Sequence, residues 1–293
     1  MQLRASLFLC GIFLKVALLY GQEYTFKVLL NKGDNKLRTE SGESANLTTG
    51  QQISGSGTIV TNSDSYLGLL HRTGKVLQLK GEGTHTISQL QEQVIQAKRN
   101  SRFDQYIPER LSKNERSRSN DGTRAVAEVA SRTISVALPD VVDLYGDMAL
   151  IKWDATTEGA TYEVSINDIF GESIFVEQVS ENFISINFEE LTTDFKLFQI
   201  MVKDVASGVS SKSYKIKKIE PSDNPEVIEE LQALVADIDK ESPLEMLILS
   251  TFYQQKGLYL DALTNYEETI NTFPDITDLD IYYQDFLGAY IVE

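Results

Sequence analysis

PLEMLILSTFYQQKGLYLDALTNYEETINTFP, residues 243–274, is the stretch that decides the fold of the C-terminal part of this chain. Its apolar and aromatic residues recur at the three-to-four spacing of a helix face on both sides of Gly257. That spacing predicts two antiparallel helices. Small side chains at Ser250 and Ala262 let the helices approach closely, and Tyr253 and Tyr266 fill the groove between them.

The ends of the two predicted helices carry their own signals. Ser242 precedes Pro243 and can accept a hydrogen bond from the backbone amide three residues on, while Glu245 can reach back toward it. Gly257 can adopt the left-handed conformation that a tight turn between helices requires, so it ends the first helix. Pro274 stops the second helix, because it cannot donate a backbone hydrogen bond.

Two further helices flank this pair, and their apolar positions also recur every three to four residues. These positions are Val227, Ile228, Leu231, Leu234, Val235 and Ile238 upstream, and Leu279, Tyr282, Tyr283, Phe286, Leu287 and Tyr290 downstream. The order of small and aromatic residues from Met246 to Pro274 resembles a tetratricopeptide repeat. The resemblance implies a tetratricopeptide-like helical domain over residues 220–293, with the outer helices capping one repeat. A generic four-helix bundle is the alternative.

The N-terminus predicts export. Arg4 precedes an apolar run from Ala5 to Tyr20, and Gly21 before Gln22 suits cleavage after a small residue, so residues 1–21 read as a signal peptide. The run is shorter than the roughly 20 residues that span a bilayer, and no later segment is apolar enough to form a transmembrane span. A periplasmic or extracellular location follows.

Cysteine and charge exclude several classes of function. Cys10 is the only cysteine and lies inside the apolar run, so the mature chain has no thiol for a disulfide, a nucleophile or a metal site. The segment from Ile219 to Glu293 holds 17 acidic residues against 2 basic residues. Such an acidic helical end repels phosphate, so nucleic acid is not an expected partner.

Residues 22–87 predict short strands broken by glycine-containing turns. The strands are Tyr24–Leu30, Ile53, Thr58–Asn62, Tyr66–His71 and Lys75–Leu79. The phrases NLTTGQQI at Asn46–Ile53 and SYLGLLHRTGKVLQL at Ser65–Leu79 resemble the FecR-like β domain of bacterial envelope proteins. That resemblance implies a small β domain punctuated by glycines.

Residues 88–132 predict a connector helix and a flexible linker. Ile87, Leu90, Val94 and Ile95 lie on one predicted helix face, whereas residues 114–122 offer no apolar face to bury. Basic residues are frequent here, but acids are interspersed and no aromatic platform accompanies them, which favours a solvated connector over a nucleic-acid site.

Residues 133–219 predict an immunoglobulin-like β sandwich of seven short strands. The strands are Ile134–Leu138, Met148–Trp153, Thr161–Ile166, Ile174–Val179, Phe183–Phe188, Phe198–Lys203 and Ser213–Ile216. This segment resembles a fibronectin type III module in the placing of Trp153 on an early strand and of Leu191 before Phe198, Ile200 and Val202. Phe198 departs from the pattern, since a tyrosine is expected near it. Trp153 is expected in the core.

The sequence offers no residues that we assign to catalysis, a cofactor or a metal. His71 and His85 sit beside glycine-rich turns without ligand spacing, and the acids of Asp275–Asp280 lack the glycine and glutamate of a calcium loop. No glycine-rich segment leads from a strand into a helix as a phosphate cradle requires. The sequence therefore predicts a protein that is not an enzyme and needs no cofactor.

The fold class predicted for the whole chain is multidomain, mainly β followed by α. The predicted function is that of an exported envelope scaffold or adaptor, whose β modules act as a spacer while the helical end binds other envelope or periplasmic proteins. The residues expected to line its groove are Met246, Tyr253, Tyr266 and Tyr282. The alternative is a glycan- or ligand-binding accessory protein that uses the β sandwich. Oligomeric state stays open.

Overall fold

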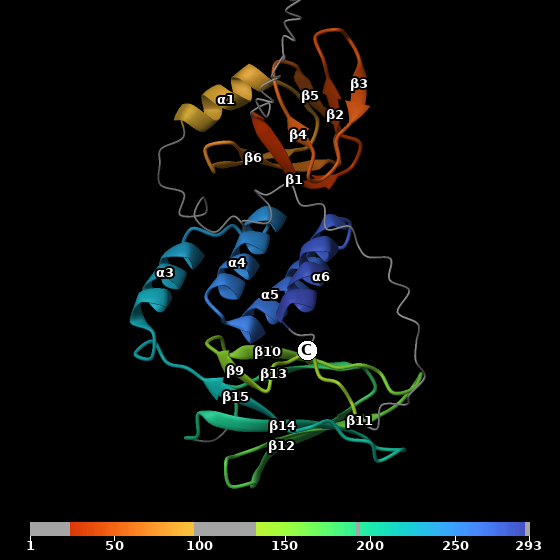
Figure 1. Cartoon of the computed structure of the whole chain (residues 1–293), viewed down its shortest axis with the longest axis vertical. Helices are drawn as coiled ribbons and strands as arrows, with labels where there is room; N and C mark the ends of the chain where they lie inside the picture. The colour runs from red at the N-terminus through yellow and green to blue at the C-terminus, as the bar shows by residue number, and fades with distance from the viewer. Residues whose placement is uncertain (1–23, 97–132, 192–193, 291–293) are drawn as a thin grey trace, which may run out of the picture.

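The structure is a computed structural model that describes residues 24–96, 133–191 and 194–290. β-sheets occupy the first two thirds of the described chain and helices the last part, which confirms the predicted order of β followed by α. The predicted signal peptide, residues 1–21, and the linker and most of the connector, residues 97–132, lie outside the described residues. Figure 1 shows the C-terminal helices between two β units rather than at one end of the molecule.

The N-terminal β unit consists of two four-stranded sheets and one helix (Figure 1). One sheet has the strand order β4-β1-β6-β7 and the other β3-β2-β5-β8. Its elements are β1 (Phe26–Lys32), β2 (Lys36–Arg38), β3 (Ser44–Asn46), β4 (Gln52–Ile53), β5 (Thr58–Thr61), β6 (Tyr66–His71), β7 (Val76–Lys80), β8 (Gly83–Thr86) and α1 (Ile87–Gln96).

The predicted strands of this unit are present within one or two residues of their expected ends, and three more strands were missed. The missed strands β2, β3 and β8 are three or four residues long and largely polar or exposed, so they lack the apolar alternation that reveals a strand. Helix α1 buries Ile87, Leu90 and Val94 as expected. Ile95 differs from the expectation, because it is exposed.

The second β unit has a five-stranded sheet of order β12-β11-β14-β15-β9 and a two-stranded sheet of β10 and β13. The strands are β9 (Val141–Leu144), β10 (Met148–Lys152), β11 (Tyr162–Asn167), β12 (Ser173–Val179), β13 (Phe183–Asn187), β14 (Leu197–Asp204) and β15 (Tyr214–Lys218). All pairs within these sheets are antiparallel except β15 with β9, which is parallel.

One predicted strand of this unit is wrong and another was missed. Residues 134–138 form only isolated bridges, from Ile134 to Ser211 and from Val136 to Trp153. The edge strand is instead β9, at 141–144, where the polar Asp143 interrupts the apolar run and hides the strand pattern. Its pairing depends on β15, more than 70 residues further along the chain, which no local pattern reveals.

The core of the second β unit contains Trp153, as predicted. Its side chain is 2% exposed and meets the ring of Tyr162 edge-on, with 5.3 Å between ring centroids. Phe198 is buried against Phe188 in a second edge-on pair, with centroids 5.2 Å apart. Edge-on contacts of this kind add to the free energy gained by burying the rings.

Four helices follow: α3 (Pro225–Val235), α4 (Pro243–Gln255), α5 (Tyr259–Thr272) and α6 (Asp278–Tyr290). The Ser242 hydroxyl accepts a 3.2 Å hydrogen bond from the backbone N–H of Glu245, as predicted. The Glu245 side chain does not return to Ser242; it accepts from the backbone N–H of Asp239 at 2.7 Å. Gly257 ends α4 with φ at +76°, the left-handed conformation expected there.

Helices α4 and α5 pack closely through small and polar side chains. Ser250 and Ala262 are fully buried where the helices meet. The Asn265 amide of α5 donates to the Ser250 hydroxyl at 2.7 Å and to the Met246 carbonyl oxygen at 3.0 Å. These bonds satisfy polar groups that the close approach removes from water, so they fix the pairing of the helices.

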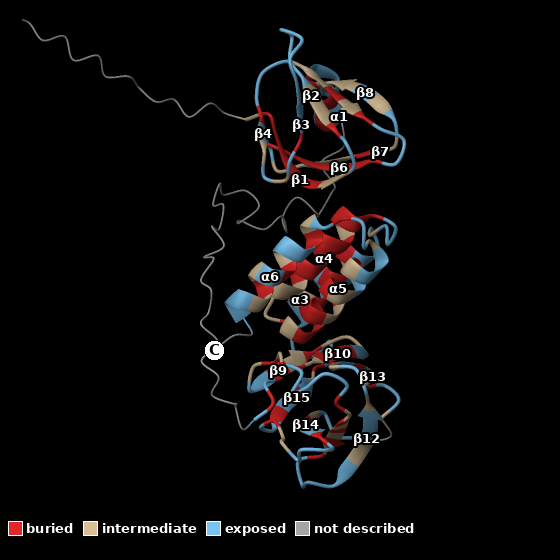
Figure 2. Ribbon diagram, turned by 90° about the vertical axis from the view of Figure 1, so that its right-hand side faces the viewer, coloured by how far each residue is buried: buried red, intermediate tan, exposed pale blue. Residues whose placement is uncertain are grey.

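The helices form a central layer that shares a core with both β units. One continuous apolar cluster runs from Leu29 and Leu30 of β1 through α4, α5 and α6 to Ile151 of β10 and Ile216 of β15. Figure 2 shows the buried residues along α4 and α5 in the middle of the molecule. None of the helices within the described ranges combines the length and hydropathy needed to cross a bilayer.

Candidate functional site

The contact between the helical layer and the second β unit centres on Asp261 in the first turn of α5. Its carboxylate accepts hydrogen bonds from the backbone N–H groups of Tyr145 at 3.0 Å and Gly146 at 2.6 Å. Lys218 of β15 holds the same turn from the other side, by donating to the carbonyl oxygens of Tyr145 at 2.5 Å and Gly146 at 2.8 Å. The turn between β9 and β10 is thus held between a carboxylate and an ammonium group.

Asp261 lies in an environment that opposes its ionised form. Its side chain is buried, and burial raises the pKa of the carboxyl group from 3.8 to about 6. The two backbone N–H donors and the positive charge of Lys218 act in the opposite direction and lower this pKa. The desolvation of the carboxylate outweighs these favourable contacts.

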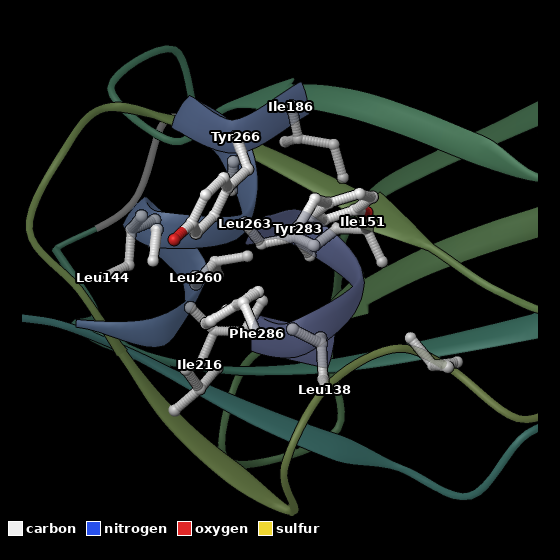
Figure 3. Close-up of a cluster of buried hydrophobic side chains, with 14 of the residues drawn as sticks. Leu138, Leu144, Ile151, Ile186, Ile216, Leu260, Leu263, Tyr266, Tyr283 and Phe286 are labelled. Atoms are coloured by element: carbon white, nitrogen blue, oxygen red, sulfur yellow. The ribbon is translucent and has the colours of Figure 1, made fainter. Parts of the chain in front are cut away.

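Further along α5, two more side chains contact β10. The Thr264 hydroxyl accepts from the backbone N–H of Leu150 at 3.0 Å. Glu267 accepts from Lys152 at 2.6 Å and from the hydroxyl of Tyr283 on α6. Apolar side chains of α5 and α6 fill the space around these contacts, and Figure 3 shows Leu260, Leu263, Tyr266, Tyr283 and Phe286 facing Leu138, Leu144, Ile151, Ile186 and Ile216.

The opposite side of the helical layer contacts the N-terminal β unit. The Tyr282 hydroxyl of α6 donates to the Leu29 carbonyl oxygen of β1 at 2.7 Å. The Gln78 side chain of β7 donates to Glu245 at 2.8 Å and accepts from the Ser242 hydroxyl at 2.9 Å. Two further contacts join the backbone N–H of Asn31 to Asp278 at 2.9 Å and the ammonium of Lys32 to Asp275 at 3.3 Å.

The four residues predicted to line a partner-binding groove lie within this layer. Met246 and Tyr266 are buried. Tyr253 and Tyr282 are partly buried, and the Tyr282 hydroxyl is engaged by β1. Burial raises the pKa of the Tyr253, Tyr266 and Tyr282 hydroxyls. All four residues lie in the helical layer, where they contact other parts of the same chain.

An exposed aromatic pair was missed by the sequence analysis. Phe170, in the turn between β11 and β12, is 75% exposed, and its ring meets that of the exposed Phe195 edge-on with 5.8 Å between centroids. Ile169 beside it is also exposed. The signal in the sequence was the pair Ile169-Phe170 placed between Asp168 and Gly171, because turn residues are seldom large and apolar.

The two histidines lie in the N-terminal β unit, outside the contacts described above. His71 is buried on β6, stacks near Phe26, and shares a 2.8 Å hydrogen bond between its Nδ1 and the Thr73 hydroxyl. Burial lowers its pKa, and the positive charges of Arg72 and Lys75 lower it further. His85 on β8 is partly buried. Across residues 24–96, 133–191 and 194–290, histidine, cysteine and carboxylate side chains nowhere gather in threes that could hold a metal ion.

Comparisons with known proteins find no family model and no curated protein that matches this chain. Among solved structures, the complex of the pro- and mature domains of RgpB from Porphyromonas gingivalis aligns at 15% identity with a TM-score of 0.22. That alignment covers 30% of this chain and 19% of the other. The Arg-specific cysteine proteinase gingipain R (RgpB) gives the same identity, TM-score and coverage of this chain, and 18% of its own chain is covered.

These comparisons correct the prediction that the chain is not an enzyme. The two solved structures named above are those of a proteinase, so that prediction is withdrawn. A TM-score of 0.22 over 30% of the chain does not show a shared fold, and it gives no argument for proteolysis by this chain. The chain spans about a fifth of the proteins that it matches.

Proposed function

We propose that this chain is an exported scaffold or adaptor protein of a bacterial cell envelope, which binds another envelope or periplasmic protein. The observation that supports this function is the position of α4, α5 and α6 between the two β units, with hydrogen bonds to both. Tyr282 bonds β1 on one side, and Asp261 bonds the β9–β10 turn on the other. A body held in this way presents its outer surfaces at fixed separations, which is what a scaffold requires.

The domain assignment belongs to the same proposal. We infer a FecR-like β domain at 22–87, a fibronectin type III or immunoglobulin-like sandwich at 133–219 and a tetratricopeptide-like helical domain at 220–293. The close pairing of α4 and α5 through Ser250 and Ala262 supports the helical assignment. The two sheets that enclose Trp153 support the sandwich. Export by residues 1–21 is part of the proposal.

One helical face available to a partner is the outer face of α6. Met246 and Tyr266 are buried between elements, so a partner would reach them only if the helices separated. Ile281, by contrast, is 54% exposed, and Gln284 lies exposed one turn further along the same face. We therefore place partner binding by the helical segment on this face, which follows the i, i+3 spacing of a helix surface.

Site-specific photo-crosslinking in intact cells tests this function. A photoreactive amino acid replaces Gln284 on α6 and, as a matched control, Glu40 in an exposed turn of the N-terminal β unit. We expect one envelope protein to be crosslinked repeatedly from position 284 and not from position 40. If position 284 gives no protein that is absent from position 40, the proposed binding of a partner through α6 is wrong.

A second function, binding of a glycan or other ligand by the sandwich, is favoured by the exposed rings of Phe170 and Phe195. An exposed aromatic ring presents flat faces and an edge, and a ligand can pack against either. Binding to a glycan array that is lost in Phe170→Ala, while position 284 yields no crosslinked protein, would support this second function over the first.

A further inference from the structure

The aromatic tip, formed by Ile169, Phe170 and Phe195, is an apolar patch on a surface where such residues are unusual. Phe170 is 75% exposed, and the other two members are also exposed. The patch joins two segments that are distant in sequence, the β11–β12 turn and the connection that precedes β14. Contiguous exposed apolar residues surrounded by polar ones mark interaction surfaces.

The part of the aromatic tip that carries Ile169 and Phe170 lies in a turn closed by hydrogen bonds. The buried carboxylate of Asp168 accepts hydrogen bonds from the backbone N–H groups of Phe170 and Glu172, each at 2.8 Å. The Asp168 backbone N–H donates to the Glu172 carbonyl oxygen at 2.9 Å, and Gly171 has φ at +87°. Since the turn is already ordered, a partner that contacts Phe170 does not have to order it on binding.

The charges beside the aromatic tip are negative. Glu172 follows Phe170 by two residues and Asp194 precedes Phe195, and both are exposed. The nearest base in sequence, Lys196, forms an ion pair with Glu220. The whole chain also carries a net charge of −16, so its electrostatic field attracts cations before they touch the surface.

We propose that the aromatic tip binds a peptide segment of a partner protein in which apolar side chains alternate with lysine or arginine. The apolar side chains of the partner contact Phe170 and Phe195, and its basic side chains lie near Glu172 and Asp194. A peptide is favoured over a glycan because the two rings meet edge-on, at an interplanar angle of 67°, and so form a ridge rather than one flat stacking surface. This inference rests on the proposed function in that the occupant is a protein.

A defined peptide tests the inference. The probe is a fluorescent 12-residue peptide of alternating leucine and lysine, and its binding to the mature chain is measured by anisotropy in about 0.15 M salt, where distant charges are screened. Peptides of alternating leucine and glutamate, and of lysine and serine, are the probe controls. The variants are Phe170→Ala and Asp194→Lys, and the matched control is Phe183→Ala, which removes another exposed aromatic ring on β13. Thermal unfolding of each variant checks its fold.

We expect the leucine–lysine peptide to bind the wild type, and Phe170→Ala to weaken binding by about tenfold or more, as loss of an aromatic anchor does. Asp194→Lys should weaken it about threefold to tenfold, and Phe183→Ala should leave it unchanged. The inference is overturned if the peptide does not bind, if the lysine–serine peptide binds equally well, or if Phe183→Ala has the effect of Phe170→Ala. Glycan binding that depends on Phe170, without peptide binding, also overturns it.

The peptide test and the crosslinking test can have different outcomes, so failure of the inference about the tip is distinguishable from failure of the proposed binding through α6. A crosslinked protein at position 284 without peptide binding at the aromatic tip would leave the scaffold function standing and overturn only the inference about the tip. Peptide binding at the tip with no specific crosslink at position 284 would show that the sandwich, and not α6, carries the protein-binding surface.

Discussion

Gly146 donates its backbone N–H to the buried carboxylate of Asp261 at 2.6 Å, and this bond joins the second β unit to the first turn of α5. A Cβ atom at position 146 would lie 2.9 Å from the same carboxylate oxygen, so only glycine allows the approach. The pair explains why a helix near the end of the chain has a defined position on a turn that precedes it by about 115 residues.

The first prediction concerns Gly146→Ala. The added methyl group has to displace the Asp261 carboxylate, which is buried and bonded to two backbone N–H groups. We expect a loss of about 1–3 kcal/mol in the free energy of unfolding, measured by denaturant titration. Gly288→Ala is the control: nothing lies within 4 Å of a Cβ there, and the position is in α6, so stability should be equal or greater. Equal stability of the two variants would contradict the prediction.

The second prediction is a pH dependence that Asp261 causes. Its pKa is raised from 3.8 to about 6 in the folded protein, so the folded state holds this proton more tightly than the unfolded state between those values. The stability that protonated Asp261 contributes is therefore fully present below about pH 4 and is lost as the pH rises through about 6. Asp261→Asn has no such titration.

Comparison of these two proteins isolates the effect, because the other acidic groups are common to both. The free energy of unfolding of the wild type minus that of Asp261→Asn should fall by roughly 2–3 kcal/mol between about pH 4 and about pH 7, at roughly 1.4 kcal/mol per pKa unit. Denaturant titrations at several pH values measure it. A difference that does not change across this range would show that Asp261 is ionised throughout.

The third prediction concerns the contact of α6 with β1. Tyr282→Phe removes the hydroxyl that donates to the Leu29 carbonyl oxygen and leaves this acceptor without its partner. We expect a loss of about 1–2 kcal/mol in the free energy of unfolding. Tyr290→Phe is the matched change at an exposed position on the same helix, and it should cost less than about 0.5 kcal/mol. Equal effects of the two variants would argue against a stabilising role for the Tyr282 contact.

The fourth prediction concerns the close approach of α4 and α5. Ser250→Leu adds a large side chain where a buried serine accepts from the Asn265 amide, so it both crowds the helices and removes one of the two hydrogen bonds that this amide donates. We expect a loss of about 3 kcal/mol or more, against about 1 kcal/mol for Ser250→Ala, which removes the hydroxyl and its hydrogen bonds without crowding the helices. Thermal and denaturant unfolding of both variants check this order. If the leucine variant is the more stable of the two, the prediction is wrong and α4 and α5 do not pack closely at position 250.

Local signals predicted the helices well and the sheets less well. The start of α4 at Pro243 follows from Ser242, and its end from Gly257, because caps and turns depend on neighbouring residues. The strand β9 was missed, because its partner β15 is distant in the sequence. Short polar strands such as β2 lack the alternation of apolar and polar residues that identifies a strand in the sequence.

The candidate site shows the same division. Periodicity placed Met246, Tyr266 and Tyr282 on apolar helix faces, but it gave no indication of what covers those faces. The sequence analysis assigned them to a partner protein, whereas in the structure they contact other parts of the same chain. The aromatic tip was not predicted, since Phe170 and Phe195 meet only after β11, β12 and β14 have formed one sheet.

The sequence by itself determined the order of β and α segments, the ends of the helices and the close pairing of α4 with α5. Each depends on residues close together in the sequence, and the α4–α5 hydrogen bonds join residues 15 and 19 positions apart. Only the tertiary structure decided that the helices lie between the β units. That position depends on contacts such as Asn31 with Asp278, separated by 247 residues, and on a shared apolar core, and local periodicity does not encode such contacts.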